Sequence, residues 1–176
     1  MKFTFDRDSM IKEISIAQEI ISTKNAMSIL SNILLIADNN SLTIKATDVK
    51  VNFETKIPVF VEEEGNTTIF CDKFMSILSS LPSGEIEFIQ NDIKVTIKPI
   101  SKKVKFDLKS MASDKFPEFS STENVPYFEI PSAELKEMIN QTIFAVSDDE
   151  KRLFMNGILF EKKEDEDGSV IMYNQG

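Results

Sequence analysis

The residue types that most often carry catalysis are scarce in this 176-residue sequence. It contains no histidine, which removes the commonest general base and the usual catalytic triads. The single cysteine, Cys71, has only Lys73 near it to lower its pKa, so we expect a packed, inert thiol. The five glycines form no phosphate-binding loop. These features argue against an enzyme and predict no cofactor.

Two acidic runs, 148–150 and 164–167, are the candidates for a metal site. Calcium loops place their ligands at alternating positions around a turn glycine, and neither run has that arrangement. We therefore interpret both runs as solvated loops and predict no metal.

Basic residues suggest a different chemistry, the binding of phosphate. The net charge of −9 excludes a polycation that coats nucleic acid, although a local basic surface would still attract it. Such residues recur on or beside the expected helices: Arg7, Lys12, Lys24, Lys73 and Lys136. If the helices share one side of the sheets, these residues predict phosphate contacts without base readout. Lysines are also ordinary on solvated helix faces, so both interpretations stay open.

Hydrophobic periodicity predicts two similar sets of elements, which together indicate an α+β fold. The first set is a strand at 2–5, a helix capped by Asp8 or Ser9, and strands at 29–37, 42–46 and 49–53, with a break or bulge near Thr47. The second set is a strand at 67–70, a helix capped by Asp72, and strands at 86–88, 93–97 and 104–108. A loop at 62–66 joins the two sets.

A third set begins at Tyr127, with a strand at 127–130, a helix capped by Ser132 and strands at 153–160 and 169–173. A constant shift of 125 positions aligns it with the first set: Phe3 with Phe128, Met10 with Leu135, Ile14 with Ile139, Ile33 with Ile158 and Leu35 with Phe160. We therefore expect a repeated module. Since the second copy is much shorter than the first, we expect unpaired strand edges and an open apolar face in it.

The cellular compartment is predicted from what the chain lacks. No apolar run approaches the length of a membrane span, and the N-terminus lacks the apolar stretch of a signal peptide. A single cysteine cannot form an internal disulfide. We expect a cytoplasmic protein that does not bind membranes.

Several segments resemble the bacterial sliding clamp family, the beta subunit of DNA polymerase III. They are Met1–Thr4, Ile29–Leu35, Ala46–Asp48, Phe116–Pro117 and, most specifically, Asn156–Glu161. Their order agrees with the repeat found above. An unrelated cytosolic scaffold for protein–protein interactions is the alternative.

The resemblance implies a DNA-clamp fold, in which each domain doubles a strand–helix–strand–strand–strand unit. Helices then line a hole around duplex DNA and antiparallel sheets form the outside of a head-to-tail homodimeric ring. It implies a processivity factor rather than an enzyme, with DNA polymerase III subunits and the clamp loader as partners. The implied domains are a complete domain at 1–121, a linker at 122–126 and a truncated second domain at 127–176, with the third domain absent.

The resemblance also implies where DNA is contacted. Lys24 stands at a DNA-contacting position, and Arg7, Lys12 and Lys73 match positions that face the hole. Arg152 follows the DNA-facing loop of the second domain, where acidic residues at 148–150 would repel phosphate. The partner-peptide cleft would lie between the second and third domains, and residues 172–176 stop at its edge, so we expect it to be absent or incomplete.

The resemblance finally implies a subunit seam along an edge strand, Lys103–Leu108, with Phe74 and Leu78 nearby. Phe106 and Leu108 alternate with charged residues, so that one face can be buried. Burial against a second subunit and burial in the domain's own core both fit this alternation.

Overall fold

The computed structural model describes residues 1–21, 29–120, 124–149, 151–161 and 171–173. The chain divides into two compact units, unit one at Met1–Ser121 and unit two at Thr122–Gly176. No helix within these described ranges is long and apolar enough to cross a membrane.

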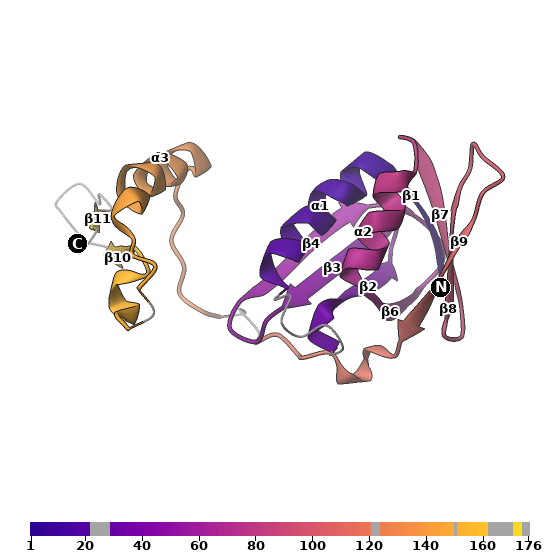
Figure 1. The fold of residues 1–176 in the computed structure, drawn as a ribbon, viewed down its shortest axis with the longest axis horizontal. Coiled ribbons are helices and arrows are strands. Elements are labelled where there is room, and N and C mark those ends of the chain that lie inside the picture. Colours follow the sequence, from indigo (N-terminus) through magenta and orange to yellow (C-terminus); the bar gives the residue numbers. More distant parts are fainter. Residues whose placement is uncertain (22–28, 121–123, 150, 162–170, 174–176) are drawn as a thin grey trace. The chain divides into compact units, whose positions relative to one another are not determined.

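Unit one combines one large antiparallel sheet with two helices that lie side by side across it (Figure 1). The elements are β1 (Lys2–Asp6), α1 (Arg7–Ile20), β2 (Asn32–Asp38), β3 (Ser41–Thr47), β4 (Asn52–Pro58), β5 (Phe60–Glu63), β6 (Gly65–Phe70), α2 (Cys71–Ser80), β7 (Glu85–Asn91), β8 (Lys94–Pro99) and β9 (Phe106–Met111). Short 3₁₀ turns at Ile29–Ser31 (η2) and Ser113–Lys115 (η3) complete it. The α+β prediction is confirmed.

The sheet is assembled from two equivalent halves. Its strand order is β4-β3-β2-β6-β9-β8-β7-β1-β5. Half A comprises β1, α1, β2, β3 and β4, and half B comprises β6, α2, β7, β8 and β9. The first strand of each half is added to the meander of the other half, β1 on β7 and β6 on β2. The two halves are thus related by an approximate two-fold operation, as the repeated pattern in the sequence predicts.

Several local features differ from the sequence-based expectation, including the start of α2, where Phe70 occupies the cap position and Asp72 is the second helical residue. β5 was not predicted and pairs with β1, and Val59 alone separates it from β4. Residues 48–51 form a turn rather than a bulge, because the carboxylate of Asp48 accepts bonds from the amides of Lys50 and Val51. The α1 cap is Asp6, whose Oδ1 accepts the Ser9 amide at 2.8 Å.

The core lies between the two helices and the sheet. Met10, Ile14 and Ala17 form the fully buried stripe of α1. Phe3 of half A stacks on Phe88 of half B with ring centroids 4.7 Å apart. Burial of these rings and aliphatic side chains joins the two halves into a single hydrophobic core.

Unit two contains α3 (Ser132–Thr142), 3₁₀ turns at Ile143–Ala145 (η4) and Leu153–Met155 (η5), and a hairpin of β10 (Leu159–Glu161) and β11 (Ile171–Tyr173). The predicted strand at 127–130 is not formed, and the predicted strand at 153–160 is reduced to η5 and the start of β10. Ser132 is the first helical residue, and Pro131 occupies the cap position. In unit one the equivalent strand, β1, pairs with β7 on one side and β5 on the other, and 127–130 has no such partner strand among the described residues.

Candidate nucleic-acid and subunit interfaces

Arg7 ties the two helices together. Its Nε donates to the carbonyl of Leu78 at 2.9 Å, and its Nη2 donates to the carbonyl of Ser79 at 3.4 Å. Its Nη1 pairs with Asp8 at 2.7 Å, and the side chain is only 19% exposed. The Arg7 guanidinium lowers the pKa of the Asp8 carboxyl. Arg7 was expected to face DNA. Its N–H groups instead donate to main-chain carbonyls at the C-terminal end of α2, which have no partner within the helix.

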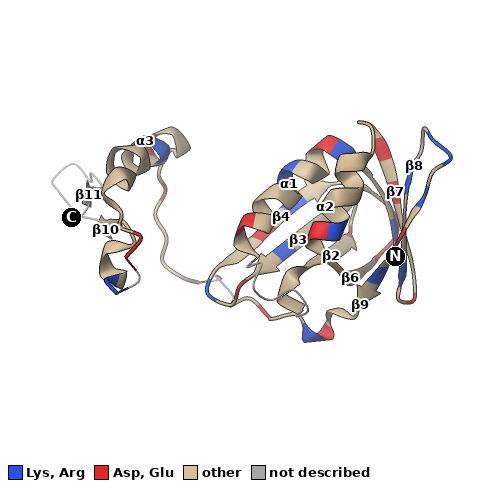
Figure 2. Cartoon of the chain, viewed as in Figure 1, with Lys and Arg blue, Asp and Glu red and all other residues tan. Residues whose placement is uncertain are grey.

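Lys12 and Lys73 are exposed, on α1 and α2 respectively, and are free of any ion pair that the structure describes for them. The expected basic helix surface is nevertheless mixed in sign (Figure 2). The helices carry the bases Arg7, Lys12 and Lys73 and the acids Asp8, Glu13, Glu19 and Asp72. Asp72 is further engaged by the amide of Gln18 at 2.7 Å. The described charges of α1 and α2 are therefore of both signs, and phosphate contact by their lysines stays a prediction.

Two further residues, Lys24 and Arg152, were predicted to contact DNA. Lys24 falls outside the described residues. Arg152, in unit two, is 60% exposed, and its Nε lies 3.0 Å from a carboxylate oxygen of Asp149. The Lys151 amide and the Arg152 side chain both bond to Asp149 and lower the pKa of its carboxyl. Arg152 thus faces an ionised partner from the acidic loop, which reduces its attraction for phosphate.

Three of the residues expected at the subunit seam belong to the core. Phe74 and Leu78 are fully buried, and Leu108 is 4% exposed. Phe74 contacts Phe88 edge-on, with ring centroids 6.4 Å apart. Hydrophobic residues on the inner face of α2 pack against the sheet of their own unit, so they offer no surface to a partner. Phe106 is partly buried against this core, and Lys103 lies exposed in the turn before β9.

The seam strand also differs from the expectation. β9 begins at Phe106 rather than Lys103, and it lies inside the sheet order between β8 and β6. It pairs with β8 over Phe106–Lys109 but with β6 only at Ser110 and Met111. The edge of Phe106–Lys109 that faces away from β8 has no strand partner among the described residues. β9 is therefore half covered, with an open main-chain edge.

A hollow of about 550 Å³ lies beside this open edge. Its lining is Phe70, Lys73, Ile93, Lys94, Asp107, Leu108 and Lys109. Phe70 is 37% exposed and Ile93 59%, so they supply an accessible apolar surface that Phe74 and Leu78 do not. The sequence analysis missed both residues. A sequence signal existed for Phe70, because alternation along a strand places it on the face opposite Ile69.

Ion pairs run along the outer face of β7, β8 and β9. Lys94 Nζ lies 2.9 Å from Asp107, and its hydrogen bond lowers the pKa of that carboxyl. Partial burial tends to raise the pKa of Glu87, but the ammonium groups of Lys98 and Lys2, at 3.2 and 3.3 Å, outweigh it and lower the pKa. Further lysines concentrate at the β8–β9 turn: Lys102, Lys103 and Lys105. These lysines lie beyond Phe106, at the opposite end of the β8–β9 pair from Ile93 and the apolar hollow.

Cys71 is buried, and burial together with nearby Asp72 raises the pKa of its thiol to about 12. No group of three or more His, Cys, Asp or Glu in the described ranges is arranged to hold a metal ion. The acidic run 164–167 lies outside the described residues.

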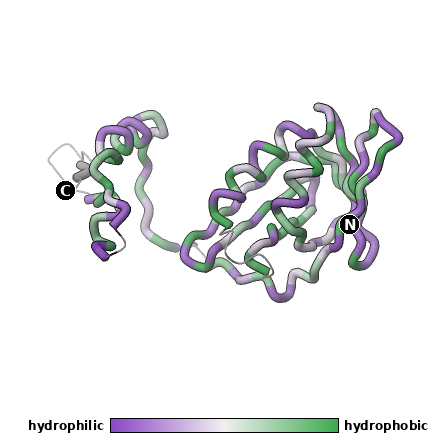
Figure 3. The backbone as a smooth tube through the Cα atoms, in the orientation of Figure 1, coloured by the Kyte–Doolittle hydropathy of each residue, from purple (hydrophilic) through white to green (hydrophobic). Residues whose placement is uncertain are grey.

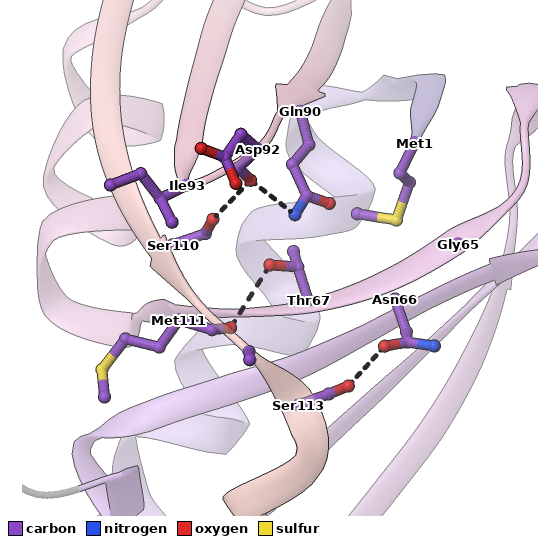
Figure 4. A pocket seen from close by; sticks show the side chains of 11 residues that line it. Met1, Gly65, Asn66, Thr67, Gln90, Asp92, Ile93, Ser110, Met111 and Ser113 are labelled. Carbon is purple, nitrogen blue, oxygen red and sulfur yellow. Dashed lines mark hydrogen bonds between the residues drawn. The ribbon is translucent and has the colours of Figure 1, made fainter.

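A second hollow, of about 470 Å³, opens where β6 and β9 diverge (Figure 4). Its polar groups bond largely to one another. The hydroxyl of Thr67 donates to the carbonyl of Met111 at 3.5 Å, and the amide of Gln90 donates to the carbonyl of Asp92 at 3.1 Å. None of the predicted site residues lines it.

The fold matches one class of protein, the sliding clamps that serve DNA polymerases. Residues 1–120 match the model of the DNA polymerase III beta subunit N-terminal domain, and residues 129–173 match that of its central domain. The chain therefore belongs to the DNA polymerase III beta subunit family.

Relatives and solved structures agree with this family assignment. The chain is 46% identical over 158 residues to the beta sliding clamp of Treponema pallidum, covering 90% of this chain and 43% of that protein. It is 27% identical over 175 residues to the beta sliding clamp of Bacillus subtilis, covering 94% and 46%. The structure superposes on Caulobacter crescentus pol III beta with a TM-score of 0.85 at 26% identity, covering 98% of this chain and 46% of that one. The Bartonella birtlesii clamp bound to griselimycin gives 0.86 at 29%, covering 94% and 44%. The chain thus spans less than half the length of these relatives.

Proposed function

We propose that this chain supplies the first domain and part of the second domain of a DNA sliding clamp, a processivity factor that encircles duplex DNA as a homodimeric ring. The observation that carries the proposal is the match of two successive clamp domain models, in their family order, to a fold built of doubled halves. In this role the protein is not an enzyme, works in the cytoplasm, and holds polymerase III subunits on DNA after the clamp loader has placed it.

We assign the subunit seam to the open edge of β9 and the hollow beside it. An unpaired strand edge provides main-chain hydrogen bonds to a second strand, and the exposed Phe70 and Ile93 provide apolar contact. The lysines at the β8–β9 turn favour an acidic partner surface. Phe106 and Lys103 remain proposed seam residues. The buried residues Phe74, Leu78 and Leu108 contribute only by stabilising the domain that carries the seam.

We assign phosphate contact to Lys12, Lys73 and Lys24, with Arg7 as the residue that fixes the two helices and Arg152 as a minor contributor. The mixed charge of the helices favours weak, non-specific attraction. A ring then holds DNA by topology and not by affinity, which is the behaviour that a processivity factor needs.

The test uses a chimera in which residues 1–173 replace the matching part of the Treponema pallidum clamp. With polymerase III and clamp loader from one bacterium, primer extension on long single-stranded circles should give products as long as those made with the parent clamp. Short, distributive products from a chimera that is folded and dimeric would contradict the proposal.

A further inference from the structure

The segment that follows β9, residues 112–119, crosses unit one on the outer face of the sheet, opposite the two helices. The alternation of side chains along β2 identifies this face. Ile33 and Leu35 are fully buried in the core beneath the helices, so Leu34 and Ile36 point the other way. These two side chains and the segment line one hollow of about 410 Å³. We call residues 112–119 the clasp.

β2 requires cover on both of its faces. It is hydrophobic from Ile33 to Ala37, without the polar alternation of a strand that has one wet face (Figure 3). A continuous apolar run is typical of a strand that is buried on both sides. The helices cover one side, and the clasp lies on the other, where Phe116 is only 6% exposed. The outer face of β7 and β8 carries ion pairs instead, such as Lys98 with Glu87 at 3.2 Å.

Polar contacts attach the start of the clasp to β6. Just before it, the carbonyl of Met111 accepts the hydroxyl of Thr68 at 3.0 Å. Within it, the hydroxyl of Ser113 donates to the side-chain oxygen of Asn66. Both partners belong to β6, so the chain passes from β9 directly onto the neighbouring strand.

Aromatic contacts attach the far end of the clasp to β3. The Lys45 ammonium lies 5.0 Å from the centre of the Phe119 ring, which is a cation–π contact. The same ammonium pairs with Glu54 of β4 at 2.8 Å, so its position is fixed. The rings of Phe119 and Phe116 lie 6.3 Å apart. The clasp therefore spans β6, β2 and β3, which are neighbours in the sheet order.

The clasp begins at a short junction of the sheet. β9 joins two groups of strands, β4-β3-β2-β6 on one side and β8-β7-β1-β5 on the other. It pairs with β8 over Phe106–Lys109 but with β6 only at Ser110 and Met111. A ladder of two residue pairs supplies few hydrogen bonds, so β9 depends on other contacts to stay beside β6.

We propose that the clasp holds β9 beside β6, with Phe116 as the positioning residue, and thereby fixes the open edge of β9 at Phe106–Lys109. The chain that leaves β9 is seated on the other group of strands, so β9 cannot move away from β6 without lifting the clasp. Lifting it exposes Phe116 and the outer side of β2 to water, which is unfavourable. The further consequence, that the fixed edge sets the geometry of association, rests on the proposed seam.

Hydrogen exchange of the 176-residue chain tests the proposal. Phe116→Ala removes the buried ring and should raise exchange in β9 about tenfold or more, while the β1–β7 pair exchanges as in the parent chain. Phe116→Leu should restore most of the protection. Glu118→Ala changes an exposed neighbour within the clasp and is the matched control, which should leave exchange unchanged. Unchanged exchange in β9 of Phe116→Ala, or an equal rise in β9 and in the β1–β7 pair, would overturn the proposal.

Phe119→Ala is a milder variant that leaves Phe116 in place and serves if Phe116→Ala does not fold. It removes the cation–π contact with Lys45 and should raise exchange in β9 about threefold. Exchange in β9 that stays at the parent rate in a folded Phe119→Ala variant would count against the clasp. The measurement needs no second subunit, so its outcome is separate from that of the proposed seam, which a change at Ile93 tests.

Discussion

The Nε of Arg7 donates to the main-chain carbonyl of Leu78 at 2.9 Å, so the first residue of α1 caps the end of α2. At the other end of the helix pair, Gln18 of α1 bonds to Asp72 at the start of α2 at 2.7 Å. The helices are thus fixed to each other at both ends. Arg7 belongs to the scaffold that orients this surface.

Replacing Arg7 by alanine should destabilise unit one by about 1.5–3 kcal/mol, because carbonyls at the end of α2 lose charge-assisted bonds. Arg7→Lys should recover only part of this loss, since an ammonium cannot reproduce the planar fork. Urea denaturation of the parent chain and the two Arg7 variants gives their free energies of unfolding. Lys12→Ala is the matched control and should change stability by less than about 0.5 kcal/mol. Equal effects of Arg7→Ala and Lys12→Ala would show that the Arg7 contacts contribute nothing.

Ile93→Glu should weaken association of the clamp-length chimera at least tenfold, about 1.4 kcal/mol, while the domain stays folded. Ile93 is 59% exposed beside the open edge of β9, so the change places a charge in the proposed seam without emptying the core. Analytical ultracentrifugation and thermal melting report the two effects. An intact dimer would refute the seam assignment.

Leu108→Lys should behave differently and unfold unit one. Leu108 is 4% exposed, so the substitution removes a core side chain and buries an ammonium, at a cost of about 3 kcal/mol or more. Had Leu108 been buried only at a subunit seam, the other interpretation left open by the sequence, the same substitution would leave the domain folded. A folded Leu108→Lys variant would show that the side chain reaches the surface.

DNA binding by the 176-residue chain should be weak and steeply dependent on salt. With Lys12, Lys73 and Lys24 as the assigned phosphate contacts, log K should fall with log salt with a slope of about −2.7, from a Kd of about 10⁻⁴ M or weaker. Replacing all three lysines by alanine should abolish this salt dependence, while Glu19→Gln should strengthen binding. Fluorescence anisotropy on linear duplex checks it, and tight binding that resists salt would contradict this prediction.

Stability should fall in acid, partly through Glu87 and Asp107. Folding lowers the pKa of both carboxyls below their ordinary values of 4.5 and 3.8. The ionised groups therefore stabilise the fold above those values, and this contribution is lost as the pH falls through the folded-state pKa. The variant Glu87→Gln with Asp107→Asn should have lower stability at neutral pH and a shallower loss below about pH 4.5. Thermal melting across this pH range measures the difference. If the double variant loses stability with falling pH as steeply as the parent chain, the ion pairs contribute nothing.

The alternation of hydrophobic residues was sufficient to predict the doubled halves of unit one, because each strand and helix there has one buried face. It could not show which partner buries that face. Leu108 and Phe74 were buried as the pattern requires, but in their own core rather than at a seam. β5 was missed because Pro58 and the acidic residues after Phe60 masked a short strand.

The strand predicted at 127–130 failed for a related reason. Its sequence has the period of a strand, but a strand needs an edge to pair with, and the equivalent strand of unit one pairs with β7 and β5. Charge was the hardest property to predict. Whether a lysine or arginine is free depends on carboxylates and carbonyls brought beside it by folding, as Arg7 and Arg152 show.

The most direct test of the clamp assignment is retention on circular DNA. The chimera is loaded with clamp loader and ATP onto nicked circular duplex and separated from free protein by gel filtration in high salt. We predict that it stays with the circle and is released when a single cut linearises the DNA, because the ring holds DNA by topology. Release from the intact circle, or retention on the linear form, would contradict the assignment.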